Sequence, residues 1–256
     1  MDIKEALEAF KPVISIPFPE GFSISLFGSE LTAFVINESI LVSWGVMALL
    51  IIGSLILTRN LQQIPRGPQV ILEALIGFLN TFSKEHFGKR AGVYGPYIGT
   101  IFLFLFAANS IPVISPLGIG LLHSEPPFTI KPPTRDINVT AAFALLTILL
   151  VLIGGLRAKG LRGWGKKLLS PAPMMLPFNL LEYLIRPLSL CLRLFGNILG
   201  GYIIMLLVEG ALPIPLVVPA FLSLYFDLFD GLIQAVVFTF LTTLFIAEAV
   251  AEEEHI

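Results

Sequence analysis

Long apolar runs constrain this chain more than any other feature of its sequence. Three runs carry no charged residue, at 40–57, 91–122 and 137–156, and two longer apolar segments follow at 177–208 and 215–250. At about 1.5 Å per residue, helices of such length cross most or all of a hydrocarbon core about 30 Å thick. The pattern predicts an all-α integral membrane protein with five transmembrane helices.

The composition agrees with this reading. Charged residues make up 13% of the 256 residues, against about 25% in average soluble proteins, so they could not build the charged shell of a soluble enzyme. The net charge of −2 argues against a nucleic-acid partner. The one cysteine excludes an internal disulfide and a four-cysteine zinc site, and no metal or cofactor is expected. The mixed charges at the N-terminus do not predict a cleavable signal peptide.

Lysine and arginine residues indicate how the helices are oriented. Ten of the 16 lie in two segments, 59–90 and 157–167, which follow the first and third apolar runs. The N-terminal segment and the stretch near residue 130 carry two each. Because cytoplasmic loops are rich in Lys and Arg, the N-terminus is predicted to lie outside, and five crossings then place the C-terminus in the cytoplasm.

Residues 69–87 form no span but have the pattern of an amphipathic helix. Their apolar positions fall on one helical face, at 71, 72, 75, 78, 79 and 82. We predict an interfacial helix over 68–88 at the cytoplasmic membrane surface. The alternative is a surface helix packed on the protein's own loops.

A polar stripe interrupts the fourth apolar segment. Its members are spaced three or four residues apart and share one helical face: Glu182, Arg186, Ser189, Arg193 and Asn197. An arginine at the bilayer centre costs about 2.5–3.5 kcal/mol, so we expect this face to meet protein or water. For Arg186 the alternative is a purely structural ion pair with Glu182, one turn away. Arg193 has no acid one turn away on its own helix.

The length of the last two segments predicts a tilted helical hairpin. As helices, residues 177–208 and 215–250 measure about 48 and 54 Å, which exceeds the hydrocarbon core. Either each helix kinks, with Pro187 and Gly231 as candidates, or the pair is strongly tilted. In an antiparallel pair the midpoints place Arg193 level with Gln234, near mid-membrane.

This arrangement divides the polar residues of the hairpin into two groups. The outer group comprises Asp227, Asp230, Asn197, Tyr202 and Glu209, and the inner group comprises Ser189, Arg186, Glu182 and Glu248. Arginine stays protonated, so Arg193 cannot relay a proton, but it can attract a carboxylate and repel a cation. The pattern predicts two polar half-paths separated by one cation, with a mobile carboxylate from another chain carrying the ion past it.

The segment around Arg193 resembles the signature helix of subunit a of bacterial-type F-type ATP synthases. The match includes residues 186–197, where Arg193 precedes Phe195-Gly196-Asn197, as well as Asp136 to Thr140, Gln234 and the acidic tail. It covers nearly the whole chain. The resemblance implies a non-catalytic stator subunit whose offset aqueous half-channels pass protons or Na⁺, with Arg193 between them facing the carboxylate of a rotating ring of c subunits. It also implies contacts with peripheral-stalk b subunits, the soluble catalytic sector and membrane lipid.

The resemblance assigns expected roles to individual residues. Gln234 corresponds to the polar partner beside the arginine and Asn197 to the asparagine of the motif. Asp227 occupies a position where relatives commonly place Glu or His in the outer half-channel. The sequence departs at Tyr202, where many relatives have Glu or His. We hypothesise that Asp230 or Glu209 compensates, which intact ATP-driven pumping by both Asp230→Asn and Glu209→Gln variants would contradict.

Two other kinds of membrane protein fit the composition. A secondary ion-coupled transporter, the main alternative, usually has an internal repeat with broken helices in both halves, and the sequence has neither. A subunit of a respiratory complex would favour His pairs for haem, whereas His86, His123 and His255 lie outside the apolar spans. The sequence has no Gly-x-x-x-x-Gly-Lys-Ser/Thr loop, so chemistry on ATP is expected to belong to partners.

These predictions divide the chain into four parts. They are an extracytoplasmic segment at 1–36, peripheral transmembrane helices at 37–170, the ion-path hairpin at 171–251 and an acidic cytoplasmic tail at 252–256. The acidic tail and the lack of a transit-peptide pattern lead us to expect a bacterial plasma membrane. The coupling ion stays open between H⁺ and Na⁺, because the outer acids would serve either.

Overall fold

The computed structural model describes residues 14–17, 24–26, 29–31, 33–118, 131–169, 172–211, 222 and 224–251. Its α-helices are α2 (Glu38–Thr58), α3 (Pro68–Phe87), α4 (Ala91–Gly118), α5 (Ile137–Leu169), α6 (Leu176–Ala211) and α8 (Gly231–Val250). Short turns of 3-10 helix form η1 (Gly88–Arg90), η2 (Pro133–Arg135) and η3 (Pro173–Met175), and a π-helical segment, η4 (Leu224–Asp230), leads into α8. Five helical segments are long and apolar enough to cross a membrane, which confirms the predicted architecture.

The described part of the N-terminal segment holds two short antiparallel strand pairs. β1 (Ile14–Pro17) pairs with β4 (Ala33–Ile36), with Ile14 opposite Ile36, and β2 (Ile24–Leu26) pairs with β3 (Ser29–Leu31). The sequence analysis did not predict these strands. Runs of three or four residues are too short for the alternating apolar pattern that identifies a strand.

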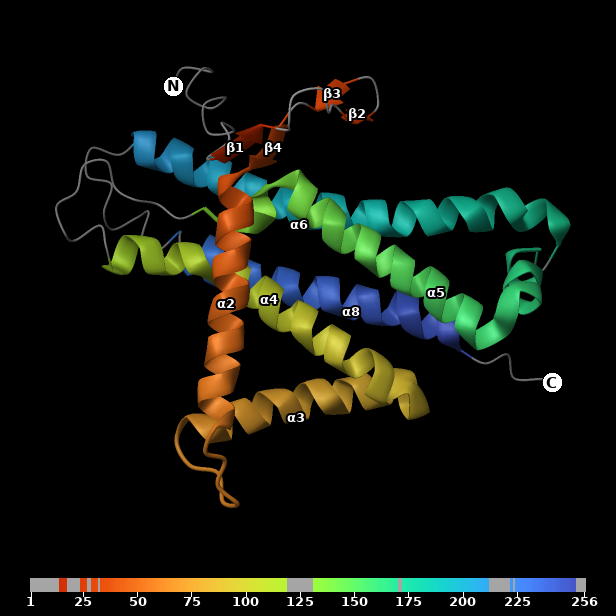
Figure 1. Ribbon diagram of the computed structural model, residues 1–256, viewed down its shortest axis with the longest axis horizontal. Coiled ribbons are helices and arrows are strands. Elements are labelled where there is room, and N and C mark those ends of the chain that lie inside the picture. The colour runs from red at the N-terminus through yellow and green to blue at the C-terminus, as the bar shows by residue number, and fades with distance from the viewer. Residues whose placement is uncertain are drawn as a thin grey trace.

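Helix α2 lies in a very different direction from α6 and α8. In Figure 1, α2 runs upright, whereas α6 and α8 run across the view in opposite directions. α6 packs mainly along α5, and α8 lies against α4 and α5, while α6 and α8 touch each other over a shorter stretch. The last two helices are therefore strongly inclined to α2, as predicted for the tilted pair. The connection between them lies mostly outside the described residues.

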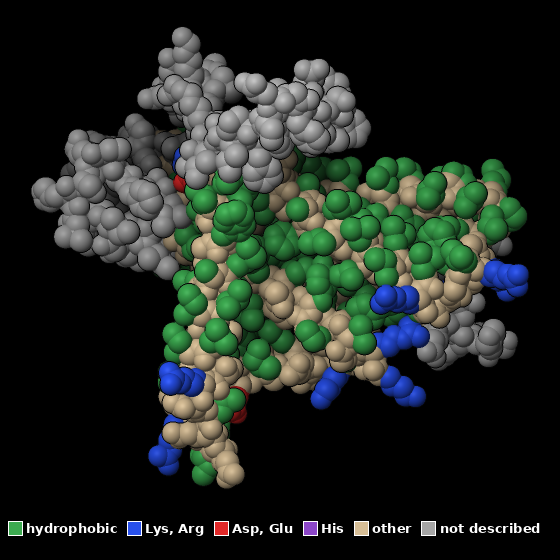
Figure 2. Space-filling view, in the orientation of Figure 1, with side chains coloured by type: hydrophobic (Ala, Val, Ile, Leu, Met, Phe, Trp, Pro, Cys, Tyr) green, Lys and Arg blue, Asp and Glu red, His purple; other side chains and the backbone are tan. Residues whose placement is uncertain are grey.

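Exposure of apolar side chains separates the lipid-facing surface from the core. The main core lies between α4, α6 and α8 and includes Leu105, Leu190, Leu194, Ala235 and Phe238. In contrast, Val46 is the one residue of α2 that is buried, as expected of a span surrounded by lipid. Figure 2 shows hydrophobic side chains over most of one face, with Lys and Arg gathered along its lower edge and right end, near the ends of α3 and α5.

Helix α5 extends further than predicted. A basic loop was expected after Leu156, but α5 continues to Leu169 with one interruption at Gly160, where φ is 68° and ψ is 171°. Glycine reaches this conformation without a steric penalty. The basic residues that follow Leu156 therefore lie on a kinked helical extension, which corrects the predicted loop.

The amphipathic segment forms α3, which begins at Pro68 and ends before Gly88, where φ is 53°. α3 occupies the residues of the helix predicted over 68–88, with Pro at its first position and Gly just past its end, as is typical of helix boundaries. Leu79, Ser83 and Phe87 are buried, and α3 packs against α4. Its position at the membrane surface stays a prediction.

The two candidate interruption points behave differently. α6 continues through Pro187, whereas the π-helical η4 ends at Asp230, directly before Gly231. A Cβ atom on Gly231 would lie 2.8 Å from the Cβ of Asn109 in α4. Since side chains do not approach so closely, glycine at this position lets α8 begin in direct contact with α4.

Candidate functional site

The polar stripe of α6 lies on an exposed face. Ser189, Arg193 and Asn197 are exposed, whereas the next residue after each of them, Leu190, Leu194 and Ile198, is buried. The packed face also includes Cys191, whose Sγ lies 3.5 Å from Oγ1 of Thr140 in α5. One face of α6 is therefore fixed by packing on its neighbours, while the polar face is open along the helix.

Arg193 is the isolated cation of this exposed face. Among the residues that the structure describes, none forms an ion pair or hydrogen bond with its guanidinium. Exposing a permanently charged side chain to lipid at the bilayer centre costs about 2.5–3.5 kcal/mol of free energy. The surface around Arg193 therefore suits an aqueous or protein partner, and a carboxylate satisfies the charge best.

Arg186, seven residues earlier, is fully engaged. It pairs with Glu182 one turn away, and its Nη1 donates a hydrogen bond of 2.6 Å to Oε2 of Glu248 in α8. Its guanidinium carbon also lies 5.0 Å from the centre of the Phe245 ring. The pair with Glu182 is the alternative that the sequence left open for Arg186. The cross-helix bond to Glu248 was missed, because residues 62 positions apart give no local sequence signal.

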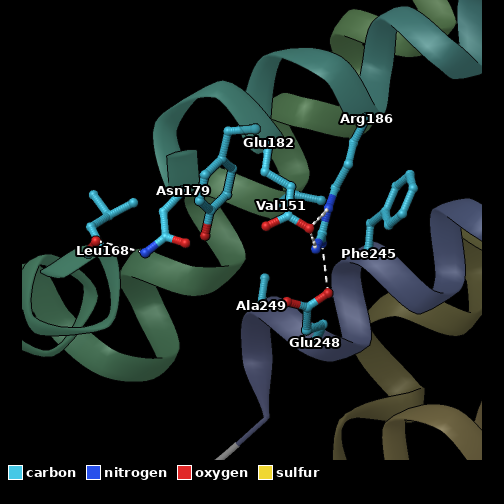
Figure 3. A pocket seen from close by; sticks show the side chains of 9 residues that line it. Val151, Leu168, Asn179, Glu182, Arg186, Phe245, Glu248 and Ala249 are labelled. Carbon is cyan, nitrogen blue, oxygen red and sulfur yellow. Dashed lines mark hydrogen bonds and ion pairs between the residues drawn. The ribbon is translucent and has the colours of Figure 1, made fainter. Parts of the chain in front are cut away.

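These side chains line a cavity between α5, α6 and α8. Its volume is about 230 Å³, and its polar lining includes Asn179, Glu182, Arg186 and Glu248. Figure 3 shows both carboxylates converging on the Arg186 guanidinium, with Asn179 turned toward the carbonyl of Leu168. The structure thus brings Glu182 and Glu248, two of the predicted inner residues, to one polar space near the end of α8.

The polar residues at the start of α8 are only partly as expected. Gln234 is buried and hydrogen-bonded to Asp230, and within the described part of the chain no hydrogen bond joins it to Arg193. The side chains of Asp227 and Glu209 lie outside the described residues. Asp227 and Asp230 both lie in η4, whose turns are π-helical, so the residue spacing of an α-helix does not apply between them.

In the C-terminal half of α6, Tyr202 contacts an unexpected cation. The guanidinium carbon of Arg135 in η2 lies 4.2 Å from the centre of the Tyr202 ring, within the range of a cation–π contact. Tyr202 was a predicted residue of the outer group, whereas Arg135 had no predicted role. The two residues are far apart in the chain, so only the fold could reveal the contact.

A buried polar chain joins η2 to α8. Thr134 Oγ1 donates a hydrogen bond to Oδ1 of Asn109, and Asn109 Nδ2 donates to the carbonyl oxygen of Gly231 at 3.4 Å. Thr134 and Asn109 are both almost completely buried. The sequence signal that could have indicated these hydrogen bonds is Asn109, a polar residue that directly follows the most apolar part of the run at 91–122.

Across the described ranges, no three His, Cys, Asp or Glu side chains come together in a way that could hold a metal ion. The polar groups described above are carboxylates, amides and guanidinium groups spaced along two inclined helices.

Comparison with known proteins gives one consistent match. The family model described as ATP synthase A chain matches residues 40–247. ATP synthase subunit a, sodium ion specific, of Propionigenium modestum is 33% identical over 258 residues, covering 98% of this chain and 88% of the relative. ATP synthase subunit a of Moorella thermoacetica is 39% identical over 215 residues, covering 84% and 91%. The chain therefore belongs to the ATP synthase A chain family.

Proposed function

We propose that this chain is the stator subunit of a rotary ATP synthase membrane sector. It passes ions between the two sides of the membrane through two offset half-paths, and Arg193 separates these half-paths. The chain is an ion-translocating subunit with no catalytic step of its own. The family match does not favour the alternative of a secondary transporter.

The observation that supports this proposal most directly is the exposure of Arg193 on the polar face of α6 and its lack of a partner among the described residues. A permanent cation in this setting attracts a carboxylate and repels a passing cation. Such a group prevents direct leakage and requires the ion to travel on a carboxylate of the rotor ring.

The inner half-path is proposed to begin at the cavity of about 230 Å³ lined by Glu182, Arg186 and Glu248. From there the polar face of α6 continues through Ser189 toward Arg193. The outer half-path is proposed to use Asn197, Tyr202 and Asp230, with Asp227 and Glu209 on the same side. Gln234, buried beside Asp230, orients that carboxylate through their hydrogen bond.

The remaining assignments follow from this role. The chain is a multi-pass membrane protein with five helical segments long enough to span. We place it in a bacterial plasma membrane with the N-terminal segment 1–36 outside and the tail 252–256 in the cytoplasm, because the basic segments cluster on one side. Its proposed partners are the ring of c subunits, the b subunits of the peripheral stalk and the soluble catalytic sector. Residues 37–170 support the hairpin at 171–251.

The decisive experiment is the Arg193→Ala substitution in the complete complex. ATP synthesis driven by an imposed ion gradient should fall to background in reconstituted vesicles, while the complex still assembles. Arg162→Ala, which removes an exposed cation from the end of α5, serves as the matched control and should keep near-normal synthesis. Gradient-driven synthesis retained in Arg193→Ala would refute the proposed function.

The coupling ion needs a separate measurement. One relative is named as sodium ion specific, and the acids of the outer half-path can serve H⁺ or Na⁺. ATP hydrolysis by the intact complex, measured with and without Na⁺ at several pH values, separates the two ions. Stimulation by Na⁺ at high pH indicates Na⁺ coupling, and no response at any pH indicates H⁺.

A further inference from the structure

The turn η2 connects the outer parts of α6 and α8. Thr134 reaches the start of α8 through Asn109, which donates a hydrogen bond to the Gly231 carbonyl. The next residue, Arg135, stacks on the ring of Tyr202 in α6 at 4.2 Å. Two consecutive residues of one short turn therefore determine contacts to both long helices.

The side of this connection that faces α8 is rigid. Thr134 and Asn109 are buried, so the loss of either hydrogen bond would leave an unsatisfied buried polar group, which is costly. The approach of Gly231 to Asn109 leaves no room even for a methyl group. Arg135 therefore extends toward α6 from a base that is fixed relative to α8.

The side that faces α6 depends on the Tyr202 ring. A guanidinium stacked on an aromatic ring interacts with its face, and the phenolic hydroxyl group is not required for the contact. Tyr202 stands where the family resemblance leads one to expect a Glu or His relay. The observed contact gives the ring itself a function at this position.

We propose that Arg135 is a positioning residue of the outer half-path and that Tyr202 is the platform on which it stacks, not a proton relay. The inference rests on the proposed function. By holding Tyr202 at a fixed separation from the start of α8, Arg135 sets how readily ions from the outer side reach Asp230. The inner half-path, whose cavity lies near the other end of α8, is independent of this contact.

The test compares five variants in reconstituted complexes: Arg135→Ala, Arg135→Lys, Tyr202→Leu, Tyr202→Phe and the control Arg66→Ala, which removes an exposed cation between α2 and α3. ATP synthesis is measured while the H⁺ or Na⁺ concentration is varied on the outer side alone, and then on the inner side alone. Yield of assembled complex and ATP hydrolysis normalise the rates, so that a folding defect is recognised separately.

We expect Arg135→Ala and Tyr202→Leu each to raise the outer ion concentration for half-maximal synthesis by about three- to tenfold, which lies within the range of a cation–π contact. The dependence of ATP synthesis on the inner ion concentration should stay unchanged. Tyr202→Phe keeps the ring and should shift the outer value much less than Tyr202→Leu, and Arg135→Lys should be intermediate. The double variant Arg135→Ala/Tyr202→Leu should be no worse than either single variant.

Two results would overturn the inference. If Tyr202→Phe were as defective as Tyr202→Leu, the hydroxyl group would be the active part and the platform role would be wrong. If Arg135→Ala changed the inner and outer dependences equally, its role would be general stability. Arg193→Ala in the same vesicles distinguishes the two failures. Synthesis retained in that variant would refute the proposed function on which this inference rests, whereas no synthesis in that variant together with either result above would refute this inference alone.

Discussion

Two arginines of the same helix, seven residues apart, have opposite surroundings. Arg186 pairs with Glu182 on its own helix and with Glu248 on α8. Arg193 faces outward, with no partner among the described residues. The difference arises from the neighbours, because α6 passes a carboxylate of α8 at the level of Arg186 and exposes its face at the level of Arg193.

This comparison sets a cation held in a structural ion-pair network against the cation that we propose to act in ion transport. A guanidinium between two carboxylates has its charge satisfied and links two helices. A guanidinium without a carboxylate within the chain keeps its attraction for one brought from outside. The same residue type therefore links two helices at position 186, and in the proposed function it forms an electrostatic barrier at position 193.

The largest expected effect tests this distinction directly. Arg186→Ala should keep a substantial part of the gradient-driven ATP synthesis, because it removes a link and not the barrier, whereas Arg193→Ala should show none. Each lost ion pair is worth about 0.2–1 kcal/mol when solvent-exposed, so a several-fold loss in assembled complex is expected for Arg186→Ala. Equal inactivity of the two assembled variants would show that both arginines belong to the ion barrier.

A second variant makes the two arginines alike. Ser189→Glu places a carboxylate four residues before Arg193, the same spacing as Glu182 to Arg186, and both positions are exposed. A pair at this spacing is worth about 0.2–0.5 kcal/mol on a helix surface and should compete with the rotor carboxylate. Synthesis should fall about twofold and recover partly at higher salt, where the pair is screened.

The uncharged Ser189→Gln variant is the control for side-chain size. If it lowered synthesis as much as Ser189→Glu, steric obstruction of the exposed face would explain the loss. A dependence on salt found only in the Glu variant would support competition for Arg193.

The smallest expected effect is on thermal stability, and it shows whether Glu182 or Glu248 contributes more to the ion pairs of Arg186. Glu248→Gln breaks a link between α6 and α8, whereas Glu182→Gln breaks a contact within one helix turn. We expect Glu248→Gln to lower the thermal stability of the assembled complex slightly more, with each change below about 1 kcal/mol, since both carboxylates are about half exposed. A larger loss for Glu182→Gln would show that the link across the helices contributes little.

Much of the fold could be predicted from the sequence, because apolar length and periodicity are local properties. The spans, α3 and the shared polar face of α6 all follow from spacing along one segment. The extension of α5 through Gly160 and the π-helical turns of η4 could not be predicted, since backbone irregularity depends on packing against other helices. The short strands before α2 have too few residues for an apolar/polar alternation to predict them.

The site could be predicted only where its members share one helix. Arg193 and the pair of Arg186 with Glu182 follow from spacing on α6. Glu248 was placed on the inner side but without its partner, and the contact of Arg135 with Tyr202 was missed. Such contacts depend on the relative axial position of α6 and α8 and on where η2 lies against them. Neither is specified by the sequence of a single segment.

The burial of Cys191 has a practical consequence. It is the one cysteine of the sequence, and it is held against α5 on the packed side of α6. Thiol reagents need an accessible thiolate, so the natural chain offers them no target on the polar face. Single cysteines introduced on that face, such as Gly196→Cys, can therefore be labelled without reaction at Cys191. Residues that the rotor ring protects from labelling can then be identified one by one.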